Sequence, residues 1–242
     1  MNLIIDIGNS RIKLGVFKNN ELLESFVFAD MFVCDAELVL RKYRDIKNCI
    51  IGATGIIPTD LLEYLSNTFP NLIVLSGNTN LPFKNLYQTK ETQGPDRIAA
   101  VAGAISMFPS SDVLVIDAGT AITYDFINKQ GEYQGGAIAP GMTMRFKALN
   151  SFTQKLPLIA AGEKAELHGK TTEESIKSGV QNGIIFEIQG FIEKHRLDNP
   201  ELKIVLSGGD ANFLAEQINC TIFVEQNIVL IGLNSILNYN AQ

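Results

Sequence analysis

The chain has 242 residues, of which 46% are hydrophobic and 19% are charged, a composition typical of a globular protein of one large or two small domains. Its net charge of −6 argues against a nucleic-acid-binding surface, which is normally basic, and its three cysteines form no CxxC motif, so neither a disulfide framework nor a zinc site is expected. The first residues read as a strand and not as a signal peptide, and no apolar run approaches the roughly 20 residues that span a bilayer, so we expect a cytoplasmic protein without a membrane partner.

Strand and helix patterns alternate along the chain. Three strands are expected over residues 2–28, then helices at about 35–44 and 59–69, each followed by a short strand, and a helix at 96–107. The second half opens with three strands between residues 113 and 140, followed by helices from about 141, over 172–195, from about 211 and over 227–238, with a strand at 203–207. This order, given twice, predicts an α/β protein with two similar lobes, residues 1–111 and 112–242, joined by a short hinge near Pro109 to Asp112.

Two segments of the chain resemble each other. IIDIGNSRIKLGVF carries Asp6 and Gly8, and LVIDAGTAITYDFI carries Asp117 and Gly119, with 117 − 6 = 111 positions between the two Asp residues. Glycine lets the backbone approach a bulky anion, the N–H groups of such turns bind phosphate oxygens, and a carboxylate at a strand end suits hydrated Mg²⁺. An ordinary Asx-type turn would explain one copy. Two copies, each after a buried-type strand, favour two phosphate-binding hairpins that face one cleft.

The stretch over residues 87–104 places polar groups at the start of a helix. Pro95 stands where the helix would begin, so Asp96 and Arg97 fall in its first turn. A favourable interaction with the helix dipole would explain Asp96 by itself. The functional interpretation is a catalytic carboxylate beside a substrate-binding cation.

Two glycine-containing stretches later in the chain are candidates for nucleotide binding, and only the first fits such a role. Residues 204–214 run from a strand through Gly208 and Gly209 into a helix, a crossing at which an adenosine can lie against the backbone, although an ordinary turn explains it equally well. Residues 162–171 look like a P-loop, but their two glycines lie seven residues apart where that motif requires five, and no strand precedes them.

The segments DIGNS, YxxxxxxGPDR, IDAGTA, GGAIAPG, GKTTEESI and LSGGD, in this order, resemble those of the type III pantothenate kinases of the actin-like, sugar-kinase and Hsp70 ATPase superfamily. The likeness covers nearly the whole chain and is most specific in GPDR with its upstream Tyr. It implies two ribonuclease-H-like lobes with a cleft between them. It also implies a homodimeric cytoplasmic enzyme that transfers the γ-phosphoryl group of ATP to pantothenate, the first step of coenzyme A synthesis, with Mg²⁺ and a monovalent cation, K⁺ or NH₄⁺.

The resemblance further implies roles for single residues. Those matching the ATP-phosphate segment are Asp6, Ile7, Gly8, Asn9, Ser10, Arg11, Ile12 and Lys13, with Asp6 near Mg²⁺ and Thr120 as a further ATP contact. Those matching pantothenate contacts are Tyr87, Gly94, Pro95, Asp96, Arg97 and Thr172, where the choice of Thr172 over Thr171 rests on the alignment of GKTT alone. Asp96 matches the proton acceptor, Arg97 would hold the pantothenate carboxylate, and Asp117 matches the monovalent-cation ligand.

The chemistry of these residue types agrees with that reaction. Phosphoryl transfer from ATP depends on positioning and charge neutralisation, with the hydroxyl proton passing to a nearby Asp, and an Arg fork binds both oxygens of a carboxylate. A related sugar kinase would lack YxxxxxxGPDR, and a non-catalytic nucleotide-binding regulator would lack Asp96 or Asp6, so both alternatives rank below the pantothenate kinase. Small residues on the helix from Asp96, and Gly179 and Gly183 in the long helix, offer close-packing surfaces for a dimer or for the chain's own lobes.

Overall fold

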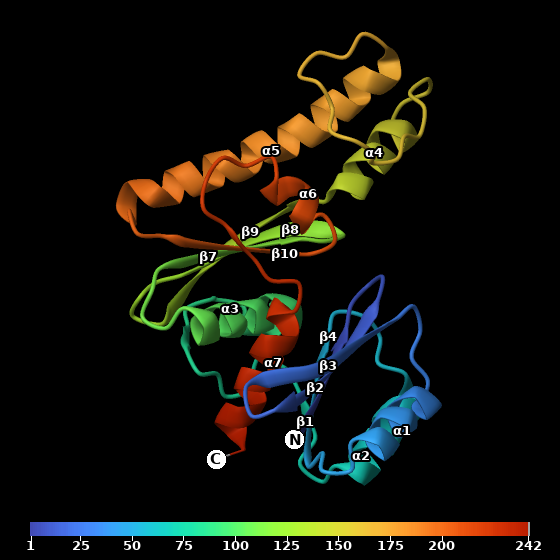
Figure 1. Cartoon of the computed structure of the whole chain (residues 1–242), viewed down its shortest axis with the longest axis vertical. Coiled ribbons are helices and arrows are strands. Elements are labelled where there is room, and N and C mark those ends of the chain that lie inside the picture. The colour runs from blue at the N-terminus through green and yellow to red at the C-terminus, as the bar shows by residue number, and fades with distance from the viewer. Residues whose placement is uncertain (242) are drawn as a thin grey trace. The chain divides into compact units, whose positions relative to one another are not determined.

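The computed structural model describes residues 1–241, and their elements form two compact units (Figure 1). The first unit comprises Met1–Ser110, Ile127–Gly135 and the segment from Asn227 onward, and the second comprises Ser111–Phe126 and Gly136–Gln226. The chain therefore passes between the units four times. The expected division at residue 111 differs from this one in two segments, because residues 127–135 and the C-terminal helix belong to the first unit.

The first unit is built on a five-stranded sheet with the order β3-β2-β1-β4-β5. β1 pairs antiparallel with β2 and parallel with β4. The bounds are β1 (Asn2–Ile7), β2 (Ile12–Lys18), β3 (Glu21–Phe28), α1 (Val33–Lys42), β4 (Asn48–Ala53), α2 (Thr59–Thr68), β5 (Ile73–Val74), β6 (Lys84–Asn85), a 3₁₀ turn (Lys90–Thr92), α3 (Pro95–Met107) and α7 (Ile228–Asn240).

Both faces of this sheet are covered. Leu3, Ile5 and Ile7 alternate along β1 and pack in one cluster with apolar side chains of α1 and α2. The opposite face meets α7, whose Leu230 and Leu233 approach the sheet closely at two glycines of β2 and β4 (Figure 1). This explains why residues 3–5 and Ile7 of β1 are apolar, while Asn2 at its start bonds to Asn234 and Asn238 of α7 and Asp6 lies near its end.

The crossing of α3 and α7 requires glycine on both helices. A Cβ at Gly232 would collide with the carbonyl oxygen of Ala99, and one at Gly103 would collide with that of Ile228. Eight consecutive residues of α3, from Arg97 to Ala104, are buried. The Ala- and Gly-rich character of α3 therefore serves packing within the first unit.

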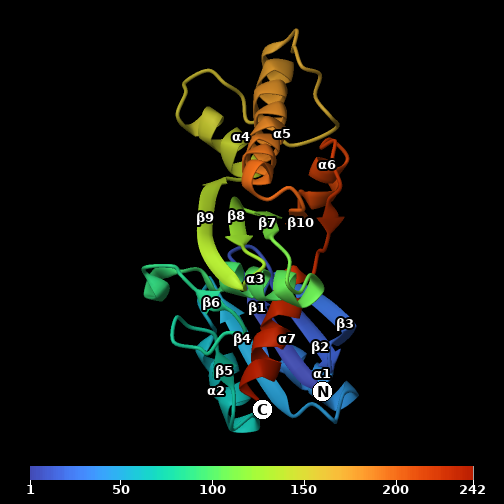
Figure 2. The ribbon, with the colours of Figure 1, turned by 90° about the vertical axis from the view of Figure 1, so that its left-hand side faces the viewer.

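The second sheet has the strand order β11-β10-β7-β8-β9-β6 and lies mostly in the second unit. Its edge strand β6 pairs with the first residues of β9, and these two short segments belong to the first unit. The bounds are β7 (Val113–Ala118), β8 (Ala121–Ile127), β9 (Glu132–Pro140), α4 (Met142–Ser151), α5 (Thr172–Asp198), β10 (Lys203–Ser207), α6 (Ala211–Ala215) and β11 (Phe223–Val224). In this unit α4 lies alongside the long helix α5 (Figure 2).

α5 has two faces of opposite character. Ile176, Ile184 and Ile192 belong to a buried stripe with four-residue spacing that packs in the core of the second unit. Another face carries Gly179, Gly183, Phe186 and Gly190, where no atom of the described residues lies within 4 Å of a Cβ built on any of the three glycines, and Phe186 is 57% exposed. This second face is open in the single chain.

The two halves of the chain repeat one topology. The order β3-β2-β1-β4-β5 corresponds, strand for strand, to β9-β8-β7-β10-β11. The prediction of an α/β protein with two similar lobes is confirmed. The expected helices and strands agree with the observed ones to within a few residues, whereas the 3₁₀ turn and the two-residue strands β6 and β11 were not predicted.

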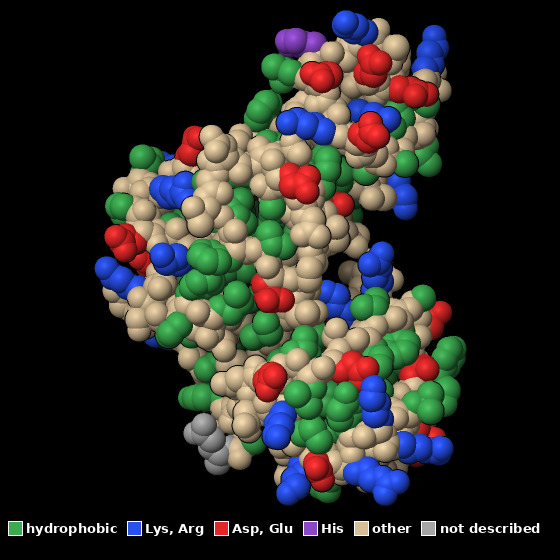
Figure 3. Space-filling view, viewed as in Figure 1, with side chains coloured by type: hydrophobic (Ala, Val, Ile, Leu, Met, Phe, Trp, Pro, Cys, Tyr) green, Lys and Arg blue, Asp and Glu red, His purple; other side chains and the backbone are tan. Residues whose placement is uncertain are grey.

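The surface over β3 and α1 mixes side-chain types, with hydrophobic groups lying between Lys, Arg, Asp and Glu (Figure 3). The alternating exposure of β3 and the ion pair of Lys42 with Glu24 at 2.7 Å account for this mixture. Within residues 1–241, no helix combines the length and the apolar composition that a membrane crossing requires.

Candidate active site

The first phosphate-type hairpin joins β1 to β2 through residues 8–11. The N–H of Gly8 donates to the carbonyl of Arg11 at 3.0 Å, and a Cβ on Gly8 would lie at the same distance from that oxygen. Asn9, Ser10 and Arg11 are exposed at its tip. Asp6 and Lys13 are opposite each other in the β1–β2 register, so a carboxylate and an ammonium flank the base of the turn.

The second hairpin joins β7 to β8 and is tighter, since only Gly119 and Thr120 separate the strands. The N–H of Gly119 donates to the carbonyl of Ala121 at 3.1 Å, as Gly8 does to Arg11. Gly141, the last residue of the GGAIAPG segment, donates its N–H to the carbonyl of Thr120 at 3.1 Å, and a Cβ there would collide with the turn. The start of α4 therefore supports this turn from behind and leaves Thr120 exposed.

The SGGD segment packs against the Asp117 carboxylate, and its Gly208 avoids a clash with that side chain. Gly208 has φ +92°, and a Cβ on it would lie 2.5 Å from Asp117 Oδ1 and collide with the carbonyl of Ala118. The N–H of Asp210 donates to the same carbonyl at 3.1 Å, which fixes the turn against the end of β7. Only glycine fits at position 208, for conformational as well as steric reasons.

The donor set at the two hairpins suits hard cations. Residues 1–241 hold no group of three or more His, Cys, Asp or Glu side chains arranged to bind a metal ion. Asp6 and Asp117 are instead single carboxylates at strand ends, and Mg²⁺ usually takes one or two protein carboxylates and completes its shell with water and phosphate oxygens. Carboxylate oxygens beside an open turn fit a cation that arrives with its nucleotide.

The start of α3 shapes the surroundings of Asp96. Gly94 is the N-cap and Pro95 the first helical residue, as expected from the sequence. Asp96 Oδ1 accepts the N–H of Arg97 at 2.8 Å, and a Cβ on Gly94 would lie 2.5 Å from the same oxygen. Burial raises the pKa of Asp96, although the N–H and the charge of Arg97 act in the opposite direction. Asp96 is therefore a stronger proton acceptor than an ordinary aspartate.

The Arg97 guanidinium lies in an aromatic pocket of the first unit. Its Nη2 donates to the hydroxyl of Tyr133 at 3.1 Å, and its Cζ lies 5.6 Å from the centre of the Tyr87 ring. The rings of Tyr87 and Tyr133 are stacked, with centroids 6.3 Å apart and an angle of 16° between their planes. Arg97 is 5% exposed and Tyr133 is fully buried, so the guanidinium is held on its edge and on one face.

Hydrogen bonds fix the segment between Tyr87 and Gly94. The backbone N–H of Tyr87 donates to Asn85 Oδ1 at 2.9 Å, and Asn85 Nδ2 donates to Gln93 Oε1 at 2.8 Å. The two ends of this loop are thereby tied through one Asn side chain. Tyr87 and Arg97, ten positions apart in the sequence, are brought together as a result.

At the start of α5, Thr171 and Thr172 have different roles. Thr171 is the N-cap, and its hydroxyl accepts the N–H of Glu174 at 3.2 Å while Glu174 accepts the N–H of Thr171 in a capping box. Thr172 is the first helical residue and is exposed. Both line a cavity of about 630 Å³ in the second unit, with Lys170, Ser175, Leu149 and Leu156.

The structure gathers some of the predicted residues and leaves others apart. Within the first unit it joins Tyr87, Gly94, Asp96 and Arg97 into one cluster, and within the second it places Asp117 and Thr120 at one turn. Tyr133 belongs to the Arg97 cluster and was missed from the sequence. Its signal is a Tyr at an inward position of EYQGG, because a buried phenol hydroxyl requires a polar partner.

Comparisons with known proteins agree with this geometry. Residues 2–194 match the family type III pantothenate kinase. The chain is similar to the type III pantothenate kinases of Flavobacterium psychrophilum (42% identity) and Phocaeicola vulgatus (44% identity), each over 240 residues that cover 99% of both chains. Its fold is similar to the activator of the 2-hydroxyisocaproyl-CoA dehydratase from Clostridium difficile with bound ADPNP, with a TM-score of 0.57, 13% identity, and 99% of this chain and 95% of that chain covered.

The prediction made from the GPDR and hairpin motifs is therefore confirmed. The match extends over most of the chain, and the relatives are well above 30% identical over their whole length. The chain belongs to the type III pantothenate kinase family, whose ATP-dependent reaction is the first step of coenzyme A biosynthesis.

Proposed function

We propose that Asp96 is the base of the pantothenate kinase reaction. The primary hydroxyl of pantothenate attacks the γ-phosphorus of ATP, the new O–P bond forms as the bond to the β-phosphate oxygen breaks, ADP leaves, and the hydroxyl proton passes to the Asp96 carboxylate. The observation that carries this assignment is the half-buried carboxylate at the start of α3, oriented by the Arg97 N–H at 2.8 Å. A carboxylate suffices because the proton leaves late in such transfers.

Arg97 is proposed to bind the carboxylate at the other end of pantothenate. Its planar fork suits a carboxylate, and the Tyr87 ring on its face restricts the fork to one orientation. Gly94 and Pro95 form the turn that carries both residues. Thr172 is the proposed pantothenate contact from α5, because the hydroxyl of Thr171 is already used by the helix cap.

The two hairpins are proposed to bind ATP and its cations. Residues 6–13 and Thr120 would contact the phosphates, Asp6 would hold Mg²⁺ and Asp117 a monovalent cation, either K⁺ or NH₄⁺. These cations supply positive charge that neutralises the phosphate oxygens during transfer. The SGGD turn would border the adenosine.

The enzyme is further proposed to be a cytoplasmic homodimer. The support is the open face of α5 with Gly179, Gly183 and Gly190, since small residues let a second copy approach closely and C₂ is the commonest closed symmetry. The exposed Phe186 on the same face supplies apolar surface for such a contact.

A coupled assay of ADP release tests the assignment of the substrate carboxylate. Arg97→Lys is expected to raise the KM for pantothenate about tenfold or more, because losing one charged hydrogen bond costs about 1.5 kcal/mol. The KM for ATP is expected to change little. Arg41→Lys, at an exposed position of α1, is the matched control and should leave both constants unchanged.

A substrate analogue without the carboxylate provides a second test. Pantothenyl alcohol carries CH₂OH in place of the carboxylate and should be a poor substrate for the native enzyme. If it is phosphorylated as readily as pantothenate, Arg97 does not act as a carboxylate clamp.

A further inference from the structure

We propose that Tyr133 is a positioning residue that sets the orientation of the Arg97 guanidinium for the substrate carboxylate. The proposal rests on the proposed role of Arg97 and extends it to a residue on a different element, the start of β9. Tyr133 does not touch the substrate in this account. It acts through Arg97.

The contacts around Tyr133 restrain the guanidinium in two directions. The phenol hydroxyl accepts from Arg97 Nη2 at 3.1 Å, which restrains the rotation of the fork within its plane. The Tyr133 ring stacks on Tyr87, and the Tyr87 ring in turn lies against the guanidinium, which fixes the plane itself. Phe83 meets the Tyr133 ring edge to face, with centroids 6.2 Å apart, so the phenol has little freedom to turn.

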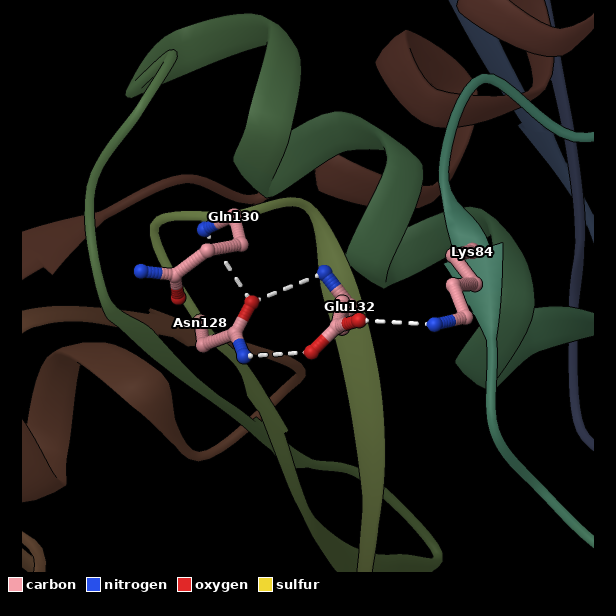
Figure 4. Close-up of polar contacts among 4 residues, drawn as sticks. All are labelled: Lys84, Asn128, Gln130 and Glu132. Atoms are coloured by element: carbon pink, nitrogen blue, oxygen red, sulfur yellow. Dashed lines mark hydrogen bonds and ion pairs between the residues drawn. The ribbon is translucent and has the colours of Figure 1, made fainter.

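The tip of the β8–β9 hairpin holds Tyr133 in place. Asn128 Oδ1 accepts the backbone N–H groups of Gln130 and Glu132 at 3.1 and 2.9 Å, and Asn128 Nδ2 donates to Glu132 Oε2 at 3.1 Å. Figure 4 shows Glu132 lying between Asn128 on the hairpin and Lys84 on β6, with the Lys84 ion pair at 2.8 Å.

The backbone completes this support. Tyr133 is opposite Asn85 in the β6–β9 register, and its carbonyl accepts the N–H of Leu86 at 3.1 Å. Asn85 is also the residue whose side chain ties the loop from Tyr87 to Gln93. The strand pair therefore places the phenol, the Tyr87 ring and the guanidinium in one rigid arrangement.

A neutral hydroxyl is suited to this task. It orients the fork without adding a negative charge that would compete with the substrate carboxylate for the guanidinium. Orientation matters because a bidentate pair requires both N–H donors in the plane of the carboxylate. Removing the hydroxyl alone should leave the pocket filled and take away one restraint on the orientation of the fork.

Steady-state kinetics of Tyr133→Phe tests the proposal. The variant is expected to raise the KM for pantothenate roughly threefold to tenfold. This is less than the full effect of losing a hydrogen bond to a charged group, because part of the lost free energy lowers the stability of the fold and only the rest weakens binding. The KM for ATP, the kcat and the kcat/KM for pantothenyl alcohol should stay within about twofold, because none depends on the orientation of the fork. The native preference for pantothenate over the alcohol should fall by the same factor as the KM rises.

Tyr124→Phe is the matched control. Tyr124 is equally buried on the neighbouring strand, and its hydroxyl donates to Glu187 at 2.8 Å in the second unit. This variant should lower the melting temperature without changing the preference between the two substrates. A Tyr133→Phe enzyme whose two substrates are affected equally, or whose KM for ATP rises as much as that for pantothenate, would show a merely structural role and overturn the proposal.

Arg97→Lys separates this inference from the function on which it rests. If Arg97→Lys weakens pantothenate binding and Tyr133→Phe does not, the positioning role is wrong and the carboxylate clamp stands. If neither substitution changes the preference for pantothenate over the alcohol, the clamp itself is wrong and the role of Tyr133 falls with it.

Discussion

Burial raises the pKa of the Asp96 carboxyl, with Arg97 acting in the opposite direction, so the folded chain binds this proton more tightly than the unfolded chain does. A raised pKa means that the associated stability is fully present below the ordinary value of 3.8 and is lost as the pH rises through the folded-state value. At neutral pH the ionised carboxylate therefore destabilises the fold. The carboxylate that we propose as the base is thus a group whose ionised form folding disfavours.

Asp96→Asn should consequently separate activity from stability. We expect kcat to fall about 100- to 10,000-fold, the usual contribution of a positioned base. At pH 7.5 the melting temperature should rise relative to the native enzyme, because the half-buried charge is gone, and the difference should disappear below pH 3.8, where the native carboxyl is protonated in both states. Assays of ADP release and thermal unfolding at several pH values measure both effects.

The control for this substitution is Asp30→Asn, at an exposed position of the first unit. It should leave turnover unchanged. In the native enzyme, the acid limb of the kcat/KM profile should lie above pH 3.8, since it reports Asp96 in the free enzyme. Near-normal turnover by Asp96→Asn would remove this residue from catalysis.

At the scale of elements, the contact of α3 with α7 decides the stability of the first unit. A Gly→Ala change inside a helix ordinarily stabilises by up to about 1 kcal/mol. At Gly232 the sign should reverse, because the added Cβ collides with the carbonyl of Ala99, and overpacking of this kind costs about 1–3 kcal/mol. Urea unfolding of Gly232→Ala should show the loss as a lower midpoint.

Gly190→Ala is the matched change on an open helix face, since no described atom lies within 4 Å of a Cβ there. At protein concentrations low enough for the chain to be monomeric, it should leave the midpoint unchanged or raise it. Because α3 begins with the Asp96 turn, Gly232→Ala should also lower kcat even where the protein remains folded. Equal midpoints for the two variants would show that the helices can separate without cost.

The sequence predicts elements well where a local signal exists. Pro95 predicts the start of α3, and the repeated Asp-x-Gly strands predict the two matching sheets, because both signals lie within a few residues. The pairing of β6 with β9 has no such signal, since two-residue strands carry no periodicity, and so the partnership of Tyr133 with Arg97 was missed. The place of α7 in the first unit likewise depends on packing against α3, more than 100 positions away in the sequence.

At the scale of the whole molecule, the open face of α5 predicts a homodimer, and the proposed cation site predicts activity that depends on the monovalent cation. Gly179, Gly183, Phe186 and Gly190 lie along one face of the helix, where a Cβ on each glycine would meet no described atom within 4 Å and Phe186 is 57% exposed. We expect light scattering to give a homodimer. Gly183→Glu, which places a charge in the middle of this face, should shift the mass towards the monomer and lower the melting temperature only by the stabilisation that dimer formation supplies.

Activity should depend on the monovalent cation in the same preparation. The room that Gly208 leaves beside the Asp117 carboxylate suits a cation at the end of β7, so turnover should rise steeply when Na⁺ is replaced by K⁺ or NH₄⁺. Asp117→Asn should abolish this response while changing the KM for pantothenate much less, because Asp117 is not among the proposed pantothenate contacts. A protein that is monomeric at all concentrations and fully active in Na⁺ alone would contradict both the dimer and the cation site.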